Sequence, residues 1–316
     1  MRKKDISTYN HLRNSLLSYD NKTNDLPGIN SNKKLDVFIR QLIDSIRRIE
    51  YIYTIRSGDV NVRRTDPNDD IFDPIKSAIY FHRNNNINEA FWLAFLSIHF
   101  GKSLDSGWLL LRDIYGSFGN GPIWSWDRTS LNPNEFEQWL AEQYITSLND
   151  GVTRKFGNHR KYESLRPDSA RPTGRVIHSY INWIGNNHSH SDFIGYMKDE
   201  YGDNPRDLFE ALYKSMKNVI SFGRTARFDY LTMIAKLGLV DIEPGKTYME
   251  GSTGPAKGAR LLFYGNRQAD VSIRELEDKA IHLENSITLG KLGMQVLEDA
   301  LCNWQKSPSS YTLFRG

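Results

Sequence analysis

Residues 86–101, NINEAFWLAFLSIHFG, constrain the fold more than any other stretch of this sequence. On a helix, these residues present apolar side chains on nearly every side, and a helix of that kind is stable only inside a protein core. The apolar run is too short to span a bilayer, and it includes His99. Gly101 follows it and is expected to end the helix. We therefore predict that this helix lies buried at the centre of a helical domain.

The rest of the chain also carries apolar residues at helical spacing. Two clear examples are LDVFIRQLIDSIRRIEYIYTI (residues 35–55) and DNPRDLFEALYKSMKNVISFG (residues 203–223). In the second segment Asn204 is a suitable N-cap and Pro205 a suitable first-turn residue. No alternating run is long enough for a sizeable sheet, and there is no internal repeat. The sequence therefore predicts an all-α fold.

The ends of the chain give expectations about domains and location. Residues 1–35 are rich in Asn, Lys, Ser and Asp, which predicts a polar N-terminal arm, and residues 36–316 are expected to form a single helical domain. The N-terminus lacks the apolar stretch of a secretory signal. The single cysteine, Cys302, excludes an intramolecular disulfide and any multi-cysteine metal site. We expect a cytoplasmic protein that needs no membrane, and the sequence indicates no obligate protein partner.

Charge is distributed unevenly along the chain, although its net value is only +3. Seven Lys and Arg residues occur from Arg154 to Arg175, against only Glu163 and Asp168. Residues 270–299 are acidic, with seven Asp and Glu against three Lys and Arg. A basic stretch separated from an acidic one is typical of a protein that binds a polyanion such as DNA.

The segment FGNHRKYES lies inside this basic stretch and offers little apolar surface to bury. Asn158 and His159 have the donors and acceptors that read base edges. Arg160 and Lys161 suit phosphate contacts, and Tyr162 suits stacking on a base. We predict that these five residues bind DNA or the target base; the alternative is a solvated loop without function.

The segment SFGRTARFDYL supplies a candidate acid and two further basic residues. Arg224 and Arg227 are three positions apart on one helix face, with Asp229 close by. One interpretation is a structural Arg–Asp pair. In the other, Asp229 faces a pocket and stabilises positive charge that develops on a sugar. Asp270 is a rival for that role, because it precedes IRELEDKA and is expected near a helix N-terminus.

The glycine-rich segment GSTGPAKGARLLFYG, residues 251–265, does not fit the common nucleotide-binding patterns. It has neither the Gly-Lys-Ser/Thr ending of a phosphate-binding loop nor a G-x-G-x-x-G fingerprint. What remains is a short turn before a helix, as in a helix–hairpin–helix element, whose backbone amides bind a DNA phosphate. The predicted phosphate contacts are Gly254, Lys257, Gly258 and Arg260. The usual glycine positions carry Thr and Pro here, so a plain turn is the alternative.

His188, His190 and Asp192 in NNHSHSDF have a spacing that could hold a metal ion. Their Asn and Ser neighbours are typical of an exposed loop instead. We expect no metal and no other cofactor.

Taken in order, several of these segments resemble a known family. They are FDPIKSAIYF, NEAFWLAFLSIHFG, FGNHRKYES, SFGRTARFDYL, STGPAKGARLLFYG and EDALCNW, and they extend from about Asp70 to Trp304. The chain resembles the alpha-glutamyl/putrescinyl thymine pyrophosphorylase family, clade 3. The resemblance implies a fold similar to that of helix–hairpin–helix DNA glycosylases and action on phage DNA with hypermodified pyrimidines. The catalytic Asp of that fold follows the hairpin, which by position implies Asp270.

Three functional hypotheses follow from the residues and the resemblance together. The first is a DNA glycosylase that flips out and excises a hypermodified pyrimidine, such as glucosylated hydroxymethylcytosine, from double-stranded phage DNA in anti-phage defence. The second is a transferase that attaches an amine or amino acid to a pyrophosphorylated hydroxymethylpyrimidine. The third is a non-catalytic module that binds modified DNA. The sequence shows no acidic metal cluster of the kind expected for pyrophosphate chemistry, which favours excision.

Overall fold

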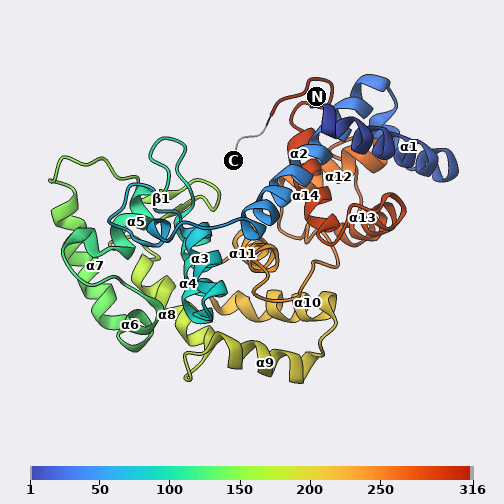
Figure 1. Cartoon of the computed structure of the whole chain (residues 1–316). Helices are drawn as coiled ribbons and strands as arrows, with labels where there is room; N and C mark the ends of the chain where they lie inside the picture. Colours follow the sequence, from blue (N-terminus) through green and yellow to red (C-terminus); the bar gives the residue numbers. More distant parts are fainter. Residues whose placement is uncertain (1, 314–316) are drawn as a thin grey trace. The chain divides into compact units, whose positions relative to one another are not determined.

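The computed structural model describes residues 2–313 and is almost entirely helical (Figure 1). Within these residues there are fourteen α-helices and one two-stranded sheet, which confirms the all-α prediction. The α-helices are α1 (Ile6–Thr23), α2 (Asn32–Ser57), α3 (Pro74–Arg83), α4 (Ile87–Phe100), α5 (Leu109–Tyr115), α6 (Trp126–Leu131), α7 (Pro133–Ser147), α8 (Thr173–Ile184), α9 (His190–Tyr201), α10 (Pro205–Ser215), α11 (Arg224–Leu237), α12 (Gly254–Tyr264), α13 (Ile273–Ile287) and α14 (Gly293–Trp304). The strands are β1 (Gly157–Asn158) and β2 (Glu163–Ser164). Short 3-10 helices are η1 (Lys3–Asp5), η2 (Pro27–Ile29), η3 (Val62–Thr65), η4 (Ser117–Gly119) and η5 (Met216–Asn218).

The chain divides into two compact units, where the sequence predicts an arm and one domain. The terminal unit combines the residues up to Ile52 with those from Glu243 onward. The central unit is Tyr53–Ile242. None of the helices within residues 2–313 is long and apolar enough to cross a membrane.

In the terminal unit, the polar N-terminal segment forms a packed helix. Helix α1 buries Leu12, Leu16 and Tyr19 and packs against α13. The Tyr19 hydroxyl lies 3.0 Å from Nδ1 of His282 on α13. Three buried side chains at helical spacing attach this segment, in which most of the other residues are polar.

Helix α12 packs closely on α14 because it carries glycine at the contact. A Cβ atom on Gly258 would lie 2.2 Å from the carbonyl oxygen of Leu301, and one on Gly254 would lie 2.6 Å from Sγ of Cys302. Both glycines lie within α12 rather than in a turn before it. These two glycines therefore allow α12 and α14 to approach each other closely.

In the central unit, α4 is the buried helix that the sequence predicts. It packs against α3, α5, α6, α9 and α11. Phe95, in its middle, stacks on Tyr180 with ring centroids 3.7 Å apart and on Phe222 at 4.9 Å. Asn86 caps the N-terminus by accepting a hydrogen bond from the Glu89 amide. Gly101 ends the helix with φ of 70°, as expected.

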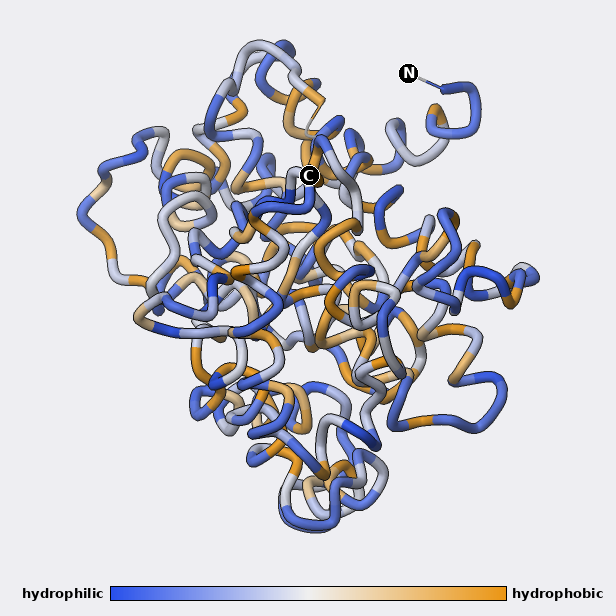
Figure 2. Tube along the Cα trace, turned by 90° about the vertical axis from the view of Figure 1, so that its left-hand side faces the viewer, coloured by the Kyte–Doolittle hydropathy of each residue, from blue (hydrophilic) through white to orange (hydrophobic). Residues whose placement is uncertain are grey.

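The other helices follow from side-chain caps and one-sided apolar patterns. Asn204 accepts hydrogen bonds from the amides of Arg206 and Asp207 at the start of α10, with Pro205 at the first position. Gly238 ends α11 in the left-handed conformation. Figure 2 shows hydrophobic and hydrophilic residues interleaved along the chain. Such patterns bury one face of each helix in its own unit.

We predict that Gly258→Ala lowers stability by about 1–3 kcal/mol, because the added methyl group forces α12 away from α14. Urea unfolding followed by circular dichroism measures the loss. Gly195→Ala is the matched control, since Gly195 lies inside α9 with nothing within 4 Å of an added Cβ. This change should raise stability by about 0.5–1 kcal/mol through helix propensity. Equal effects of the two substitutions would contradict the close-packing role.

Candidate functional site

The segment FGNHRKYES forms a short β-hairpin at the end of α4. Strands β1 and β2 pair antiparallel, with Gly157 opposite Ser164 and Asn158 opposite Glu163. Residues 159–162 form the turn between them. The sequence does not predict these strands, since two residues per strand are too few for an alternating pattern.

Asn158 joins the hairpin to α4 through its side chain. Its Nδ2 donates to the carbonyl oxygens of Ile98 at 3.0 Å and His99 at 2.9 Å. Its Oδ1 accepts from the amides of Arg160 at 3.0 Å and Lys161 at 3.2 Å. Asn158 is only 3% exposed. It therefore holds the hairpin in place, and its amide is fully engaged within the protein.

Lys161 points back from the turn into a buried aromatic cluster. Its Nζ lies 3.2 Å from Nδ1 of His99 and 4.6 Å from the ring centroid of Phe222. Burial lowers the pKa of the Lys161 amine to about 8, and Glu163 opposes that shift. Burial, aided by the Lys161 charge, lowers the pKa of His99 well below its ordinary value. The site therefore contains a neutral histidine beside an amine whose pKa is lowered to about 8.

Arg160 and Asp229 form an ion pair beside this cluster. Nη2 of Arg160 donates to Oδ2 of Asp229 at 2.8 Å. The Arg160 side chain is 43% exposed and that of Asp229 is 18% exposed. Asp229 lies in α11, and the pair connects that helix to the hairpin turn. The sequence suggests a pair between Asp229 and Arg224 or Arg227 of its own segment, whereas the structure pairs Asp229 with Arg160 of the hairpin.

Tyr162 and His159 occupy the exposed part of the turn. Tyr162 is 94% exposed and has φ of 53°. A tyrosine that exposes nearly its whole ring offers a flat surface on which a base can stack. His159 is also exposed.

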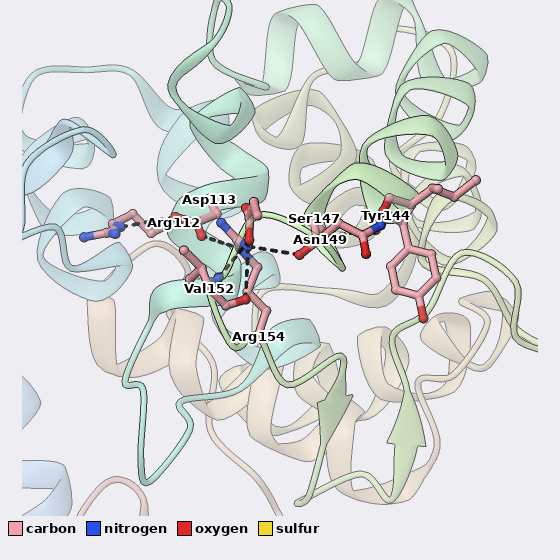
Figure 3. A network of polar contacts seen from close by, with 9 residues as sticks. Arg112, Asp113, Tyr144, Ser147, Asn149, Val152 and Arg154 are labelled. Carbon is pink, nitrogen blue, oxygen red and sulfur yellow. Dashed lines mark hydrogen bonds and ion pairs between the residues drawn. The ribbon is translucent and has the colours of Figure 1, made fainter.

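The surrounding basic residues are held by carboxylates. Arg154 is 7% exposed and donates to Asp113 at 2.6 Å and to Asp150 at 2.7 Å. Figure 3 shows this network, in which the carbonyl oxygens of Ser147 and Val152 also accept from Arg154. The other pairs within 4 Å are Lys155–Asp105, Arg166–Asp168, Arg171–Glu163 and Arg175–Glu137. The positive charge counted in the sequence is thus largely balanced in the structure, because most of the acidic partners come from other segments.

Arg224 and Arg227 lie in the first turn of α11, after the N-cap Gly223, whose residue type offers no side-chain cap. Arg227 donates to the carbonyl oxygen of Tyr213 at 3.1 Å and stacks on the Tyr213 ring at 4.3 Å. The guanidinium of Arg224 lies 5.2 Å from the ring centroid of Phe228. Both arginines therefore pack on aromatic rings of the central unit.

The remaining predicted site residues belong to the terminal unit. Lys257 is exposed in the first turns of α12, near Gly254 and Gly258. Arg260 donates to the carbonyl oxygens of Ala269 at 3.0 Å and Val271 at 3.4 Å. These two residues flank Asp270, so Arg260 fixes the backbone that presents Asp270.

Asp270 is exposed, and among residues 2–313 its carboxylate has no hydrogen-bond or ion-pair partner. Ser272, two positions later, caps α13 by accepting from the Glu275 amide. The two candidate acids therefore differ: Asp229 is half-buried and paired in the central unit, and Asp270 is exposed in the terminal unit.

His190 is a buried structural residue. Its Nδ1 and its backbone amide both lie 2.9 Å from Oδ1 of Asn88. Its Nε2 lies 2.8 Å from the Tyr180 hydroxyl. Both ring nitrogens are thus engaged, and burial lowers the pKa of His190 to about 3.

Sequence patterns do not identify three residues of the buried cluster into which Lys161 points, namely His99, Phe222 and Thr173. Nε2 of the His99 imidazole lies 3.3 Å from Oγ1 of Thr173. One signal was available, since His99 is the one imidazole within a nearly all-apolar helix. Nothing in the local sequence indicates that it meets a lysine 62 positions later.

Comparison with known proteins assigns the chain to an enzyme family. The profile of the alpha-glutamyl/putrescinyl thymine pyrophosphorylase clade 3 family matches residues 33–316. The chain belongs to this family, as the resemblance of its segments indicates. The name of the family describes an enzyme that acts on modified thymine. No curated protein and no solved structure matches the chain.

We predict that Asn158→Ala loosens the hairpin. The change leaves the carbonyl groups of Ile98 and His99 without their donor, at a cost of about 1–3 kcal/mol. Hydrogen exchange should show loss of protection in residues 157–165 and at the end of α4. His159→Ala, next to it but exposed, should leave exchange unchanged. Unaltered protection in the Asn158 variant would show that the turn does not depend on this side chain.

Proposed function

We propose that the protein is a DNA glycosylase that excises a hypermodified pyrimidine from double-stranded DNA. One observation carries the proposal beyond family membership. An anchored hairpin presents an exposed aromatic ring, Tyr162, two positions after Arg160, whose guanidinium pairs with the carboxylate of Asp229. Stacking, phosphate contact and a carboxylate are the elements that base extrusion and glycosidic cleavage require.

In this proposal the hairpin binds the DNA. Tyr162 stacks on a base exposed by extrusion, and His159 contacts the neighbouring base edges or backbone. Arg160 is the phosphate contact, since its side chain is 43% exposed and a phosphate can take the place of Asp229. Lys257, Arg260 and the amides at the start of α12 bind a backbone phosphate from the terminal unit. Asn158 acts by positioning the turn.

The chemical step needs a carboxylate close to the sugar. When the bond between C1′ and the base breaks, its electron pair leaves with the base and C1′ gains positive charge. A carboxylate stabilises that charge and orients the water that adds to C1′, which leaves an abasic site. Asp229 is the first candidate, because it lies in the same unit as the hairpin and is released when Arg160 binds phosphate instead. Asp270 is the second, because it is exposed and Arg260 fixes the backbone on both sides of it.

The biological setting that we propose is defence against phages. A substrate such as glucosylated hydroxymethylcytosine occurs in phage DNA, so an enzyme that excises it leaves other DNA intact. The reaction requires neither a cofactor nor a membrane.

A second candidate function is transfer of an amine or amino acid to a pyrophosphorylated hydroxymethylpyrimidine. The description of the family as a thymine pyrophosphorylase favours it. The two reactions leave different products. Excision releases a free base, and transfer leaves the glycosidic bond intact with a heavier nucleoside.

We expect the purified protein to release a modified base from phage DNA with glucosylated hydroxymethylcytosine and none from unmodified DNA. Mass spectrometry of the released base and of digested nucleosides distinguishes excision from transfer. Replacing the catalytic acid, by Asp270→Asn or Asp229→Asn, should slow release by about a hundredfold or more. Asp199→Asn, on the exposed face of α9, is the matched control. If neither candidate change slows release, both assignments are wrong.

We also predict that Tyr162→Ala weakens binding to DNA with an unpaired target base by roughly tenfold, about 1.4 kcal/mol, since a stacking surface is lost. Fluorescence anisotropy at fixed salt measures the change. Tyr196→Ala removes another exposed tyrosine, 59% exposed on α9, and should leave affinity unchanged. Equal losses in the two variants would indicate nonspecific contacts rather than stacking at the hairpin.

A further inference from the structure

The hydrogen bonds around His99 determine which of its nitrogen atoms carries the proton. The Thr173 hydroxyl donates its single proton to the carbonyl oxygen of Leu165 at 2.8 Å. Its oxygen, 3.3 Å from Nε2 of His99, must then accept from that nitrogen. Nδ1 of the neutral ring is therefore an acceptor, and Lys161 donates to it at 3.2 Å. One proton of the Lys161 amine is directed into the protein.

The surroundings of Lys161 make its neutral form easier to reach than that of an exposed lysine. The side chain is half-buried and its Nζ lies 4.6 Å from the centroid of the Phe222 ring. Phe222 stacks in turn on Phe95, so the wall behind the amine is apolar. Two titratable groups face the amine, the neutral His99 on α4 and Glu163 on β2. Desolvation outweighs the attraction of Glu163, and the pKa of Lys161 falls to about 8.

We propose that Lys161 forms a Schiff base with C1′ of the abasic deoxyribose in DNA. The inference rests on the proposed function, because excision of the base produces that sugar. An amine that is desolvated against an aromatic ring and oriented by one hydrogen bond, in a turn that also carries Arg160 and Tyr162, has the character of a carbonyl-reactive lysine. The chain thereby holds its product covalently after the base has left.

The step balances without an oxidant or a reductant. The neutral amine of Lys161 attacks the aldehyde carbon of the ring-opened sugar, and a C–N bond forms while the carbonyl π electrons move to oxygen. That oxygen takes a proton from the nitrogen to give a carbinolamine. The hydroxyl group then leaves as water with one proton from solvent, and the nitrogen lone pair forms the C=N bond. Hydrolysis reverses these steps and frees the enzyme.

The neighbouring lysine of the basic stretch lacks these features. Lys155 is 61% exposed and paired with Asp105. An exposed ammonium keeps its charge and its hydration, so it reacts slowly with aldehydes at neutral pH. This difference provides a matched control within the same segment.

The test uses the whole protein and a duplex that already contains one abasic site, prepared by excising uracil enzymatically. Sodium cyanoborohydride converts a Schiff base into a stable amine, so a covalent protein–DNA adduct should appear on a denaturing gel. Peptide mapping of the wild-type adduct by mass spectrometry should place it on Lys161. Its yield should rise with pH, with a midpoint at pH about 8. No adduct, or an adduct on another lysine, overturns the inference.

Variants add an independent measurement. Lys161→Met should lower adduct yield about tenfold or more, and Lys155→Met should leave it within about twofold. Circular dichroism establishes that each variant is folded, and the mapping of the wild-type adduct needs no variant. Base release is measured separately on modified DNA. Base release without an adduct refutes the Schiff base alone, and an adduct without base release refutes the excision step alone.

Discussion

The side chain of Asn158 is the contact on which the candidate site depends. A helix leaves its last carbonyl groups without partners, and the most buried helix of the central unit ends directly beneath the hairpin. Asn158 donates to two of those carbonyls and accepts from two amides of the turn. Gly101 permits this approach, because a Cβ atom there would lie 2.9 Å from Nδ2 of Asn158. A rigid core element thus supports an exposed turn that would otherwise have only two residues per strand to define it.

This anchoring explains how the turn separates its side chains. Tyr162 and Arg160 are directed outward, and Lys161 is directed into the core. Most basic residues nearby are already paired with carboxylates, so the field that the hairpin presents to DNA is weaker than the local sequence indicates. In the DNA complex that we propose, these arginines and lysines exchange one anionic partner for another. Stacking by Tyr162 would supply attraction that such an exchange does not.

Sequence patterns predict the elements that depend on local rules. The apolar run of α4, the Asn204 cap of α10 and the helix end at Gly101 all follow from periodicity and capping. The hairpin could not be predicted, because its stability comes from hydrogen bonds to residues about 60 positions earlier. The same holds for the pairing of Arg160 with Asp229, which are 69 positions apart. The sequence identifies the residue types of the site but not which of them meet.

The environment of Lys161 can be compared with what the two proposed reactions, excision and transfer, require of a lysine. A lysine that binds pyrophosphate needs its full positive charge, and a protein keeps that charge by exposing the amine or pairing it with acids. Lys161 has the opposite environment, with an aromatic ring and a neutral imidazole as its nearest neighbours. Such an amine is weakened as a phosphate ligand and strengthened as a nucleophile toward a carbonyl carbon. Only excision generates a carbonyl carbon in the DNA, because transfer leaves the sugar closed and the base attached. The environment of Lys161 is thus consistent with the proposed excision, on which its proposed role depends.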